Sequence, residues 1–586
     1  MPAKAGTPNT LLFIQARPRK TPDGRSADPE RFLATLPVTA KLTFDSTTKL
    51  HRGLGEVTHG THGLHDGLRI HRVPVALYRD AHNRAFFEPR PGTLRLFETF
   101  NNNVKALVDE WWERIETSQK FADNLAAIRA YQAALKPGDI TVVGLVAEGG
   151  QGMRTANNAG FLGYLEGTPQ ADELAAKREQ WTQRWLADAR INPVFLELLR
   201  QHGGDANKPT KNSAAWEACV EPLRSLFKPE QLGFTKSGLY RIVPKALVAD
   251  ESDFQFTWRQ RKAELLKHWR AEKNLADFWT SELSDGERRK RARKLHKAAH
   301  VADADWCLLC QELQRWVAEE NASRKQQRKP TIPRDTLGLR SAEDYADPAD
   351  APRIATIYNG LCGRGRFVPF RKGDPEGNRW LDNEPLYIDW SEQSVEWLST
   401  APEARWQGHK FFFTGGVTWT AVANHVAMKA RLQEPCIFDA DSMRLTPKPE
   451  VIKPIVFLAL LNSDLVSFVK MKFIKHTQKW EIGDLRQIPL VMPTNPQAAR
   501  LEKLAEMALT SKRLEFAGQQ PPHELANRAR ALSHELEAHA PAYLHPHAQR
   551  KLLATATDCL EVIQLVVNWE AEKLYGVEGG GPFDEF

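Results

Sequence analysis

The sequence predicts an α+β protein that joins a β-rich domain to a large helical insertion and a helical C-terminal region. Residues 405–493 contain short apolar runs and glycine-containing turns that are typical of strands, followed by one apolar helix and a last strand. Residues 169–350 are charge-rich and have the composition of solvated helices. Beyond residue 493, amphipathic spacing returns and continues almost to the C-terminus.

The composition excludes several classes of protein. The chain has 586 residues, of which 42% are hydrophobic and 26% are charged, as is ordinary for a soluble globular protein. Its six cysteines do not fit a disulfide-built secreted protein, and residues 1–10 lack the apolar segment of a signal peptide. The longest apolar run, residues 455–461, is too short to span a bilayer. We therefore expect a cytoplasmic protein without a membrane partner. The net charge of +7 permits an anionic partner but does not identify one.

The N-terminal part is expected to hold a strand at residues 9–17 and helices at residues 94–120 and 124–135. A further strand, residues 142–146, runs into a glycine-rich loop that continues to residue 160. Glycine lets a backbone approach other groups closely, so the amides of this loop could contact phosphates or base edges. The alternative is an ordinary tight turn.

The charge-rich middle is expected to form helices at residues 171–187, 253–277 and 285–322. Residues 287–300 carry seven Lys or Arg against one Glu. This stretch is interpreted as a solvated helix face, and the alternative is a helix that lies along a phosphate backbone.

Two groups of His or Cys residues could suggest a metal site, but we interpret neither group as one. Glycines separate His59, His62 and His65, which indicates a loop rather than a helix face. Cys307 and Cys310 have no second cysteine pair at zinc-ribbon spacing, and the leucines and tryptophan around them are typical of a buried helix face. The sequence therefore predicts no metal site.

In residues 364–390, basic side chains alternate with aromatic ones on glycine-containing turns. Arg371, Lys372 and Arg379 suit a surface that touches phosphates and base edges. The alternative is the core of a β-hairpin with a charged rim.

The next stretch is expected to contain a buried strand at residues 411–413 and a helix from Pro454 to Phe468, with lysines at and beyond the helix end. The C-terminal helices are expected at residues 498–516, 523–538 and 548–575. A flexible tail is expected after them, at residues 579–586.

Four motifs in this stretch resemble those of a known family. They are Gly416-Val417-Thr418-Trp419, Ile437-Phe438-Asp439, Leu461-Asn462-Ser463 and Gly483-Asp484-Leu485-Arg486-Gln487-Ile488-Pro489. In this order they are similar to the target-recognition region of large adenine-specific DNA methyltransferases. These are the Type IIG restriction–modification enzymes and the PglX-type methyltransferases of BREX phage-defence systems. The glycine-rich loop is similar to the opening signature of that region, from which it departs at Ala156 and Asn157, and the elements at residues 364–390 and 573–577 match further signatures.

The resemblance implies a division of the chain into a β-rich target-recognition domain and its neighbours. The expected parts are a remnant or docking region beside a methyltransferase domain (1–136), the glycine-rich opening (137–168), the helical insertion (169–350), the target-recognition β/α domain (351–495), the C-terminal helices (496–578) and the tail (579–586).

No catalytic motif is found in the sequence. Amino-methyltransferases hold the flipped base with an Asn/Asp-Pro-Pro-aromatic loop, and the nearest look-alike, Asn383-Glu384-Pro385-Leu386, lacks the second proline and the aromatic residue. The resemblance therefore implies a DNA-specificity part without a cofactor of its own. S-adenosylmethionine is expected on a catalytic methyltransferase partner, and double-stranded DNA and other phage-defence proteins are the further expected partners.

The expected DNA contacts combine residues from these motifs with the lysines beyond the apolar helix. For one of them, Trp419, the alternative is a place in the hydrophobic core. The expected contacts are Arg154, Asn158, Arg371, Lys372, Arg379, Thr418, Trp419, Lys475 and Lys479. A second hypothesis is an interaction scaffold in a defence complex that does not recognise a DNA sequence. A third hypothesis is a complete enzyme such as a nuclease, but we find no compact carboxylate–lysine cluster in the sequence that would support it.

Overall fold

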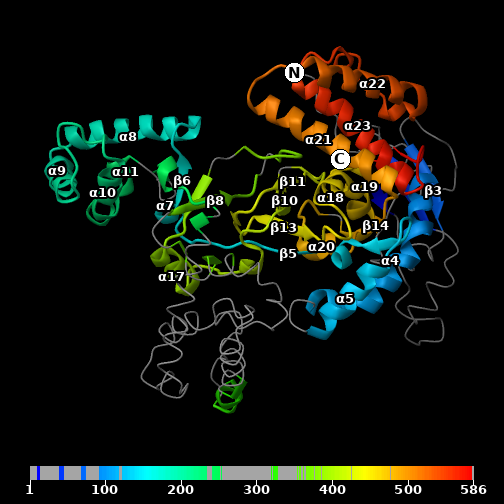
Figure 1. Ribbon diagram of the computed structural model, residues 1–586, viewed down its shortest axis with the longest axis horizontal. Helices are drawn as coiled ribbons and strands as arrows, with labels where there is room; N and C mark the ends of the chain where they lie inside the picture. The colour runs from blue at the N-terminus through cyan, green and yellow to red at the C-terminus, as the bar shows by residue number, and fades with distance from the viewer. Residues whose placement is uncertain are drawn as a thin grey trace, which may run out of the picture.

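The computed structural model confirms an α+β fold (Figure 1). It describes residues 10–12, 39–44, 68–73, 91–117, 122–233, 240–250, 365–581 except 375–376, 384–385, 424 and 476, Phe583, and a few short stretches between 252 and 361. The calls on His59, His62, His65, Cys307 and Cys310, on the basic stretch 287–300 and on the helices at 253–277 and 285–322 lie outside the described residues.

Two β-sheets form the centre of the protein, and each combines strands from distant parts of the chain (Figure 1). The order of the antiparallel first sheet is β11 (Arg431–Gln433), β10 (Gly416–Thr420), β13 (Ser442–Pro447) and β5 (Ala147–Gly150). The order of the second is β12 (Ile437–Phe438), β8 (Phe367–Arg371), β9 (Leu386–Asp389), β6 (Leu162–Leu165) and β7 (Arg241–Val243).

The glycine-rich region 137–168 is therefore not a separate unit. Its strands β5 and β6 belong to the two central sheets, and β4 (Ile140–Val142) pairs with β14 (Pro489–Val491). Short helices α6 (Val143–Val146) and α7 (Asn158–Phe161) connect these strands. The region thus folds together with residues 351–495.

The N-terminal part contains the two expected helices and, within the strand expected at residues 9–17, a described strand at residues 10–12, whereas two further strands were not predicted. The strand β1 (Thr10–Leu12) pairs with β2 (Thr39–Phe44), which pairs with β3 (Leu68–Val73). Helices α4 (Pro91–Thr117) and α5 (Ala122–Ala134) lie where two helices were expected. Buried residues of α4 share one apolar core with residues of α19 (Asp464–Val469) and with Tyr575. They are Leu96, Phe100, Val104, Val108 and Trp111, with Leu465, Phe468, Val469 and Tyr575.

The described part of the insertion is a helical unit with its own core, which lies apart from the C-terminal helices (Figure 1). The core contains Trp185 and Trp216, whose stacked rings lie 5.2 Å apart, and Phe195 against the edge of Trp185. The chain returns from the unit to the second sheet through β7. The helices are α8 (Pro169–Ala187), α9 (Ile191–Gln201), α10 (Ser213–Leu226) and α11 (Pro229–Leu232).

The strand expected at residues 411–413 is wrong. A 3-10 turn (His409–Phe411) is found there, and Phe413 has a positive φ of 58°. The physical reason is Arg444 of β13, whose fully buried guanidinium donates hydrogen bonds to the carbonyl oxygens of Phe411 and Thr414 at 2.9 and 2.5 Å. A buried charged group needs such acceptors, so the loop curls around it instead of pairing as a strand.

The helix that begins at Pro454 is broken in the middle. Helix α18 (Pro454–Leu461) ends at Asn462, and α19 (Asp464–Val469) continues at an angle of 60° into a π-helical turn (Lys470–Ile474). The Asn462 amide exchanges hydrogen bonds with the backbone of Ala430, and Ser463 caps α19 through the amide of Val466. Polar side chains that bond to backbone in this way compete with helix continuation.

The C-terminal helices are α21 (Asn495–Phe516), α22 (His523–His539) and α23 (Ala556–Leu574). The last begins later than expected because Leu553 has a positive φ of 51° and Thr555 caps the helix with Asp558. The expectation of a flexible tail is wrong at Phe583, which is buried and packs 5.1 Å from the ring of Phe468.

In the described ranges, no single helix is long and apolar enough to cross a membrane. The bent pair formed by α18 with α19 and its π-helical turn meets the length and composition criterion only when the two pieces are taken together. Two shorter helices lie in residues 351–495: α17 (Glu392–Thr400) and α20 (Ile482–Arg486).

Candidate nucleic-acid interface

A polar cavity of about 680 Å³ lies where three distant segments meet. This volume is within the roughly 300–1,000 Å³ that is usual for binding sites. We call it the polar cavity. Its lining comes from the glycine-rich loop, the end of β8, the residue Arg405 and the turn after β12: Gln151, Met153, Arg154, Thr155, Ala156, Asn157, Asn158, Ala159, Lys372, Arg405, Asp439, Ala440 and Asp441.

Backbone pairing places these segments. Strands β12 and β8 are parallel, with Phe438 opposite Arg371, so Asp439 and Lys372 follow them at the same edge of the sheet. The amide of Asp439 donates to the carbonyl of Arg371 at 3.0 Å. On the opposite wall, Arg154 and Arg405 exchange two backbone hydrogen bonds of 3.0 and 2.9 Å, which bring these two arginines side by side.

The glycines of the loop serve protein packing. A Cβ atom at Gly152 would lie 2.1 Å from the carbonyl oxygen of Phe438, and one at Gly149 would lie 1.9 Å from that of Arg444. The amides of Met153 and Arg154 already donate to Phe438 and Arg405. The expectation that backbone amides of the loop contact phosphate is therefore wrong at these two residues.

Two asparagines shape the turn at the cavity. The side-chain oxygen of Asn157 accepts from the amide of Gly160 at 3.1 Å and caps α7. The side-chain oxygen of Asn158 accepts from the hydroxyl of Thr155. Ala156, directly before them, has a positive φ of 58°, a conformation that favours glycine.

The cations of the polar cavity differ in their partners. Arg154 and Arg405 are exposed, and neither forms an ion pair with any of the described residues. Lys372 donates to the hydroxyl of Tyr240 at 2.9 Å and lies 5.6 Å from the centre of that ring. The two arginines at the rim are thus available to an anionic ligand.

Two carboxylates, those of Asp439 and Asp441, line the polar cavity together with these cations. Asp439 accepts hydrogen bonds from the amides of Asp441 and Ser442 at 3.0 and 2.9 Å. Burial and the nearby charge of Asp441 raise the pKa of Asp439 to about 6, against the opposing charge of Lys372. Asp439 therefore changes its charge close to neutral pH.

The other cations expected to contact DNA do not line the polar cavity, and each has a carboxylate partner. Arg371 pairs with Asp382 at 3.3 Å and Arg379 with Asp464 at 2.9 Å. Lys475 and Lys479 both pair with Glu481. Hydrogen bonds from Lys475 and Lys479 lower the pKa of Glu481 to about 2.

Thr418 and Trp419 were expected to contact DNA, and the structure corrects both. They lie on β10, which has β11 on one side and β13 on the other. The Thr418 hydroxyl donates to the carbonyl of Met443 at 2.8 Å, and the Trp419 indole donates to that of Trp480 at 3.0 Å. Both side chains are buried, so Trp419 belongs to the core, as the alternative for it held.

Sequence reasoning placed Arg154, Asn158 and Lys372 among the contacts, and the polar cavity brings these three together. It missed Arg405, Asp439 and Asp441. Asp439 closes a motif that was recognised, but only the pairing of β12 with β8 places it opposite the basic residues. No signal in the sequence marks Arg405, since its position depends on the bridge to Arg154.

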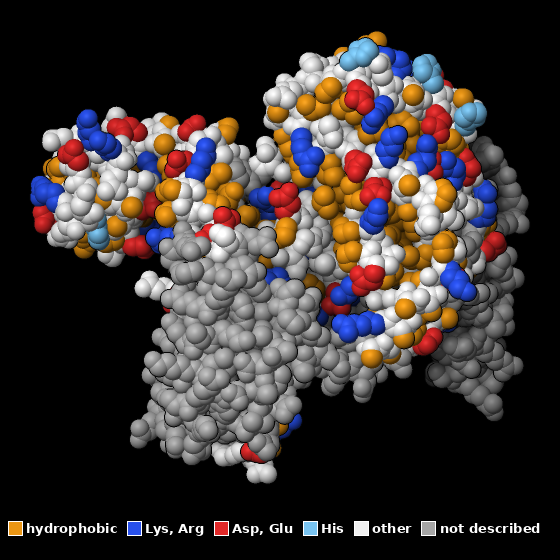
Figure 2. Space-filling model, in the orientation of Figure 1, with side chains coloured by type: hydrophobic (Ala, Val, Ile, Leu, Met, Phe, Trp, Pro, Cys, Tyr) orange, Lys and Arg blue, Asp and Glu red, His pale blue; other side chains and the backbone are white. Residues whose placement is uncertain are grey.

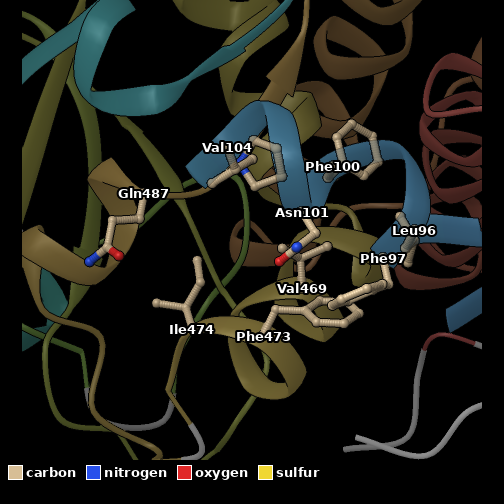
Figure 3. Close-up of a pocket in the computed structure, with 10 residues that line it drawn as sticks. Leu96, Phe97, Phe100, Asn101, Val104, Val469, Phe473, Ile474 and Gln487 are labelled. Carbon is tan, nitrogen blue, oxygen red and sulfur yellow. The ribbon is translucent and has the colours of Figure 1, made fainter. Parts of the chain in front are cut away.

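A second, apolar cavity measures only about 40 Å³ and lies between α4 and the π-helical turn (Figure 3). Phe97 and Asn101 of α4 point toward Phe473 and Val469 (Figure 3). The volume is far below that of usual ligand sites. We interpret this cavity as a packing seam between the two helices.

The surface visible in Figure 2 carries Lys and Arg interspersed with Asp and Glu over the coloured residues.

Among the residues with a described placement, no three His, Cys, Asp or Glu side chains are grouped so that they could hold a metal ion. A scan against protein-family models finds no match for this chain, and a search of curated proteins finds no significant one.

Proposed function

We propose that this chain is the DNA-specificity part of a split adenine-N6 DNA methyltransferase or restriction–modification system, and that it serves phage defence. The observation that carries the proposal is the polar cavity, with Arg154 and Arg405 unpaired at its rim. Binding to DNA is driven largely by arginine and lysine contacts to phosphates. The motif resemblance supplies the kind of enzyme.

The polar groups inside the cavity suit base edges. An asparagine amide can pair with adenine, and an aspartate can accept from the amino group of cytosine. Asn158 and Asp439 offer such groups, while the two rim arginines are placed to hold the backbone. In this account the chain positions the duplex, and a separate methyltransferase subunit with bound S-adenosylmethionine flips and methylates the adenine.

Selection from a random duplex pool tests the recognition step. The wild-type chain is expected to enrich one short sequence, and the variant with Arg154→Ala and Arg405→Ala is expected to bind more weakly. Arg528→Ala is the control, because this arginine lies on α22 in an exposed pair with Glu524. An unenriched pool from the wild type would reject sequence recognition.

Methyl transfer from labelled S-adenosylmethionine tests the split enzyme. The chain is assayed alone and together with the protein encoded next to it, on phage and host DNA. We expect activity only in the mixture. Activity of this chain alone would reject the division of labour.

An interaction scaffold is the second candidate. It is favoured by the carboxylate partners of Arg371, Arg379, Lys475 and Lys479, which use these cations to hold elements of the fold together. A scaffold binds duplex DNA no better than its net charge predicts.

A further inference from the structure

A third cavity, of about 340 Å³, lies where the helical unit meets the second sheet. We call it the arginine cavity, because four arginines from different elements line it. Its lining comes from α7, α8, α10, β7 and the residue before β8: Ala159, Gly160, Arg178, Ala214, Trp216, Glu217, Ala218, Val220, Glu221, Arg224, Arg241 and Arg366.

The deepest arginine is fixed by its surroundings. Arg178 is 4% exposed and donates to Glu217 and Ser213, each at 2.5 Å. Its Nε atom is buried and has no hydrogen-bond partner in the described structure. A buried donor without a partner is costly, so Arg178 depends on Glu217 and Ser213 to hold its position.

The other arginines outnumber their carboxylates. Arg241 and Arg366 share one carboxylate, that of Asp389, at 2.9 and 2.7 Å. Arg224 pairs with Glu221 at 3.0 Å. Together with the Arg178–Glu217 pair, the four arginines form ion pairs with three carboxylates of the described residues.

The shared carboxylate gives one arginine freedom to exchange partners. Asp389 is almost fully buried and must keep a cationic partner, and Arg241 provides one. The side chain of Arg366 is 48% exposed, so it can turn to a ligand without leaving Asp389 unpaired. A guanidinium group matches phosphate oxygens in a bidentate arrangement.

The arginine cavity adjoins the polar cavity. Ala159 of α7 lines both, so the two cavities meet at this short helix. A DNA strand held at the rim of the polar cavity needs only to pass α7 to reach the arginine cavity.

We propose that the arginine cavity binds a backbone phosphate of DNA that flanks the recognised sequence, which makes the helical unit α8–α11 a second contact to the duplex. This inference rests on the proposed function. It assigns the described part of the helical insertion to DNA rather than to a protein partner.

The test is the salt dependence of binding to a long mixed-sequence duplex, for which no recognised site needs to be known. We expect Arg366→Ala to weaken binding about fivefold and to reduce the slope of log affinity against log salt by about 1. Arg366→Lys keeps the positive charge but loses the bidentate guanidinium group. Its affinity is expected to lie between those of the wild type and Arg366→Ala. Arg200→Ala is the control, because this exposed arginine on α9 pairs with Glu197 and does not line the cavity.

Arg224→Ala is the second variant, and its effect is expected in the same direction. All variants are first compared with the wild type in thermal unfolding, and binding is measured at a temperature at which each variant is folded, because Arg366 donates two hydrogen bonds to the buried Asp389. An unchanged affinity and slope for both alanine variants would overturn the inference. Sequence selection separates it from the proposed function: enrichment by the wild type with an unchanged slope rejects only this inference, whereas a reduced slope without any enrichment rejects only sequence recognition.

Discussion

Arginines of the first sheet and of the polar cavity serve opposite purposes. Arg444 is fully buried. Its guanidinium donates hydrogen bonds to Gln433 and to two backbone carbonyls and lies 4.3 Å from the centre of the Phe438 ring. Arg154 is exposed and finds no such partner in the described structure. The comparison teaches that the availability of a cation, rather than its presence in the sequence, marks a candidate interface.

The largest expected effect concerns the buried arginine. Arg444→Met removes the donors to the oxygens of Phe411, Thr414 and Gln433, of which, in the described structure, only that of Phe411 keeps another donor, the Thr414 hydroxyl. We expect the free energy of unfolding to fall by about 3–5 kcal/mol, as chemical denaturation would measure. Arg154→Ala, the matched surface change, should alter it by less than about 0.5 kcal/mol. Equal losses for both variants would break the comparison.

The converse effect is expected for DNA binding. Arg154→Ala with Arg405→Ala removes the two unpaired cations of the rim, and we expect about a tenfold loss of affinity with a salt slope reduced by about 2. Titration of a labelled duplex at several salt concentrations measures both quantities. A variant that binds like the wild type would remove the rim from the interface.

Asp439 makes the comparison depend on pH. Its pKa of about 6 in the folded protein lies above the ordinary value of 3.8, so the folded state binds the extra proton. Stability contributed by this proton is present below pH 4 and is lost as the pH rises through 6, by about 3 kcal/mol.

Loss of the Asp439 charge also removes a repulsion of phosphate. We therefore expect tighter DNA binding at pH 5.5 than at pH 7.5, and a smaller difference in Asp439→Asn, whose amide oxygen still accepts from Asp441 and Ser442. Histidines titrate in the same pH range, so the effect of Asp439 is the difference between the pH dependence of the wild type and that of Asp439→Asn. The same pH dependence in both proteins would exclude this carboxyl as the cause.

The smallest effect is expected at a cation that already has a partner. Lys479→Ala removes an exposed pair with Glu481, and Lys475 continues to neutralise that carboxylate. Duplex affinity is expected to change by less than about twofold, within the range of exposed ion pairs. A loss of affinity as large as that of the rim variant would show that a lysine with a carboxylate partner can still contact DNA.

Local patterns predicted the helices well. The range 171–187 coincides with α8, and the start at Pro454 and the ends of α21 and α22 are close to the expected positions. These elements depend on amphipathic spacing and caps, which lie within the sequence window that defines them.

The misplaced elements depend on distant partners. Residues 411–413 are bent around Arg444, and the helix after Pro454 is broken by the bond of Asn462 to Ala430. The polar cavity has the same origin, since Asp439, Lys372 and Arg405 meet only through long-range strand pairing. A pattern that covers a few neighbouring residues does not contain such partners.

The most direct test of the account compares the affinities of the wild-type chain for its selected duplex and for a scrambled duplex of equal length at physiological salt. We predict a ratio of about 10³ or more, which falls toward 1 when Asn158 and Asp439, the base-facing groups of the polar cavity, are both replaced by alanine. A wild-type ratio near 1 would contradict sequence recognition by this chain and leave the scaffold as the better account.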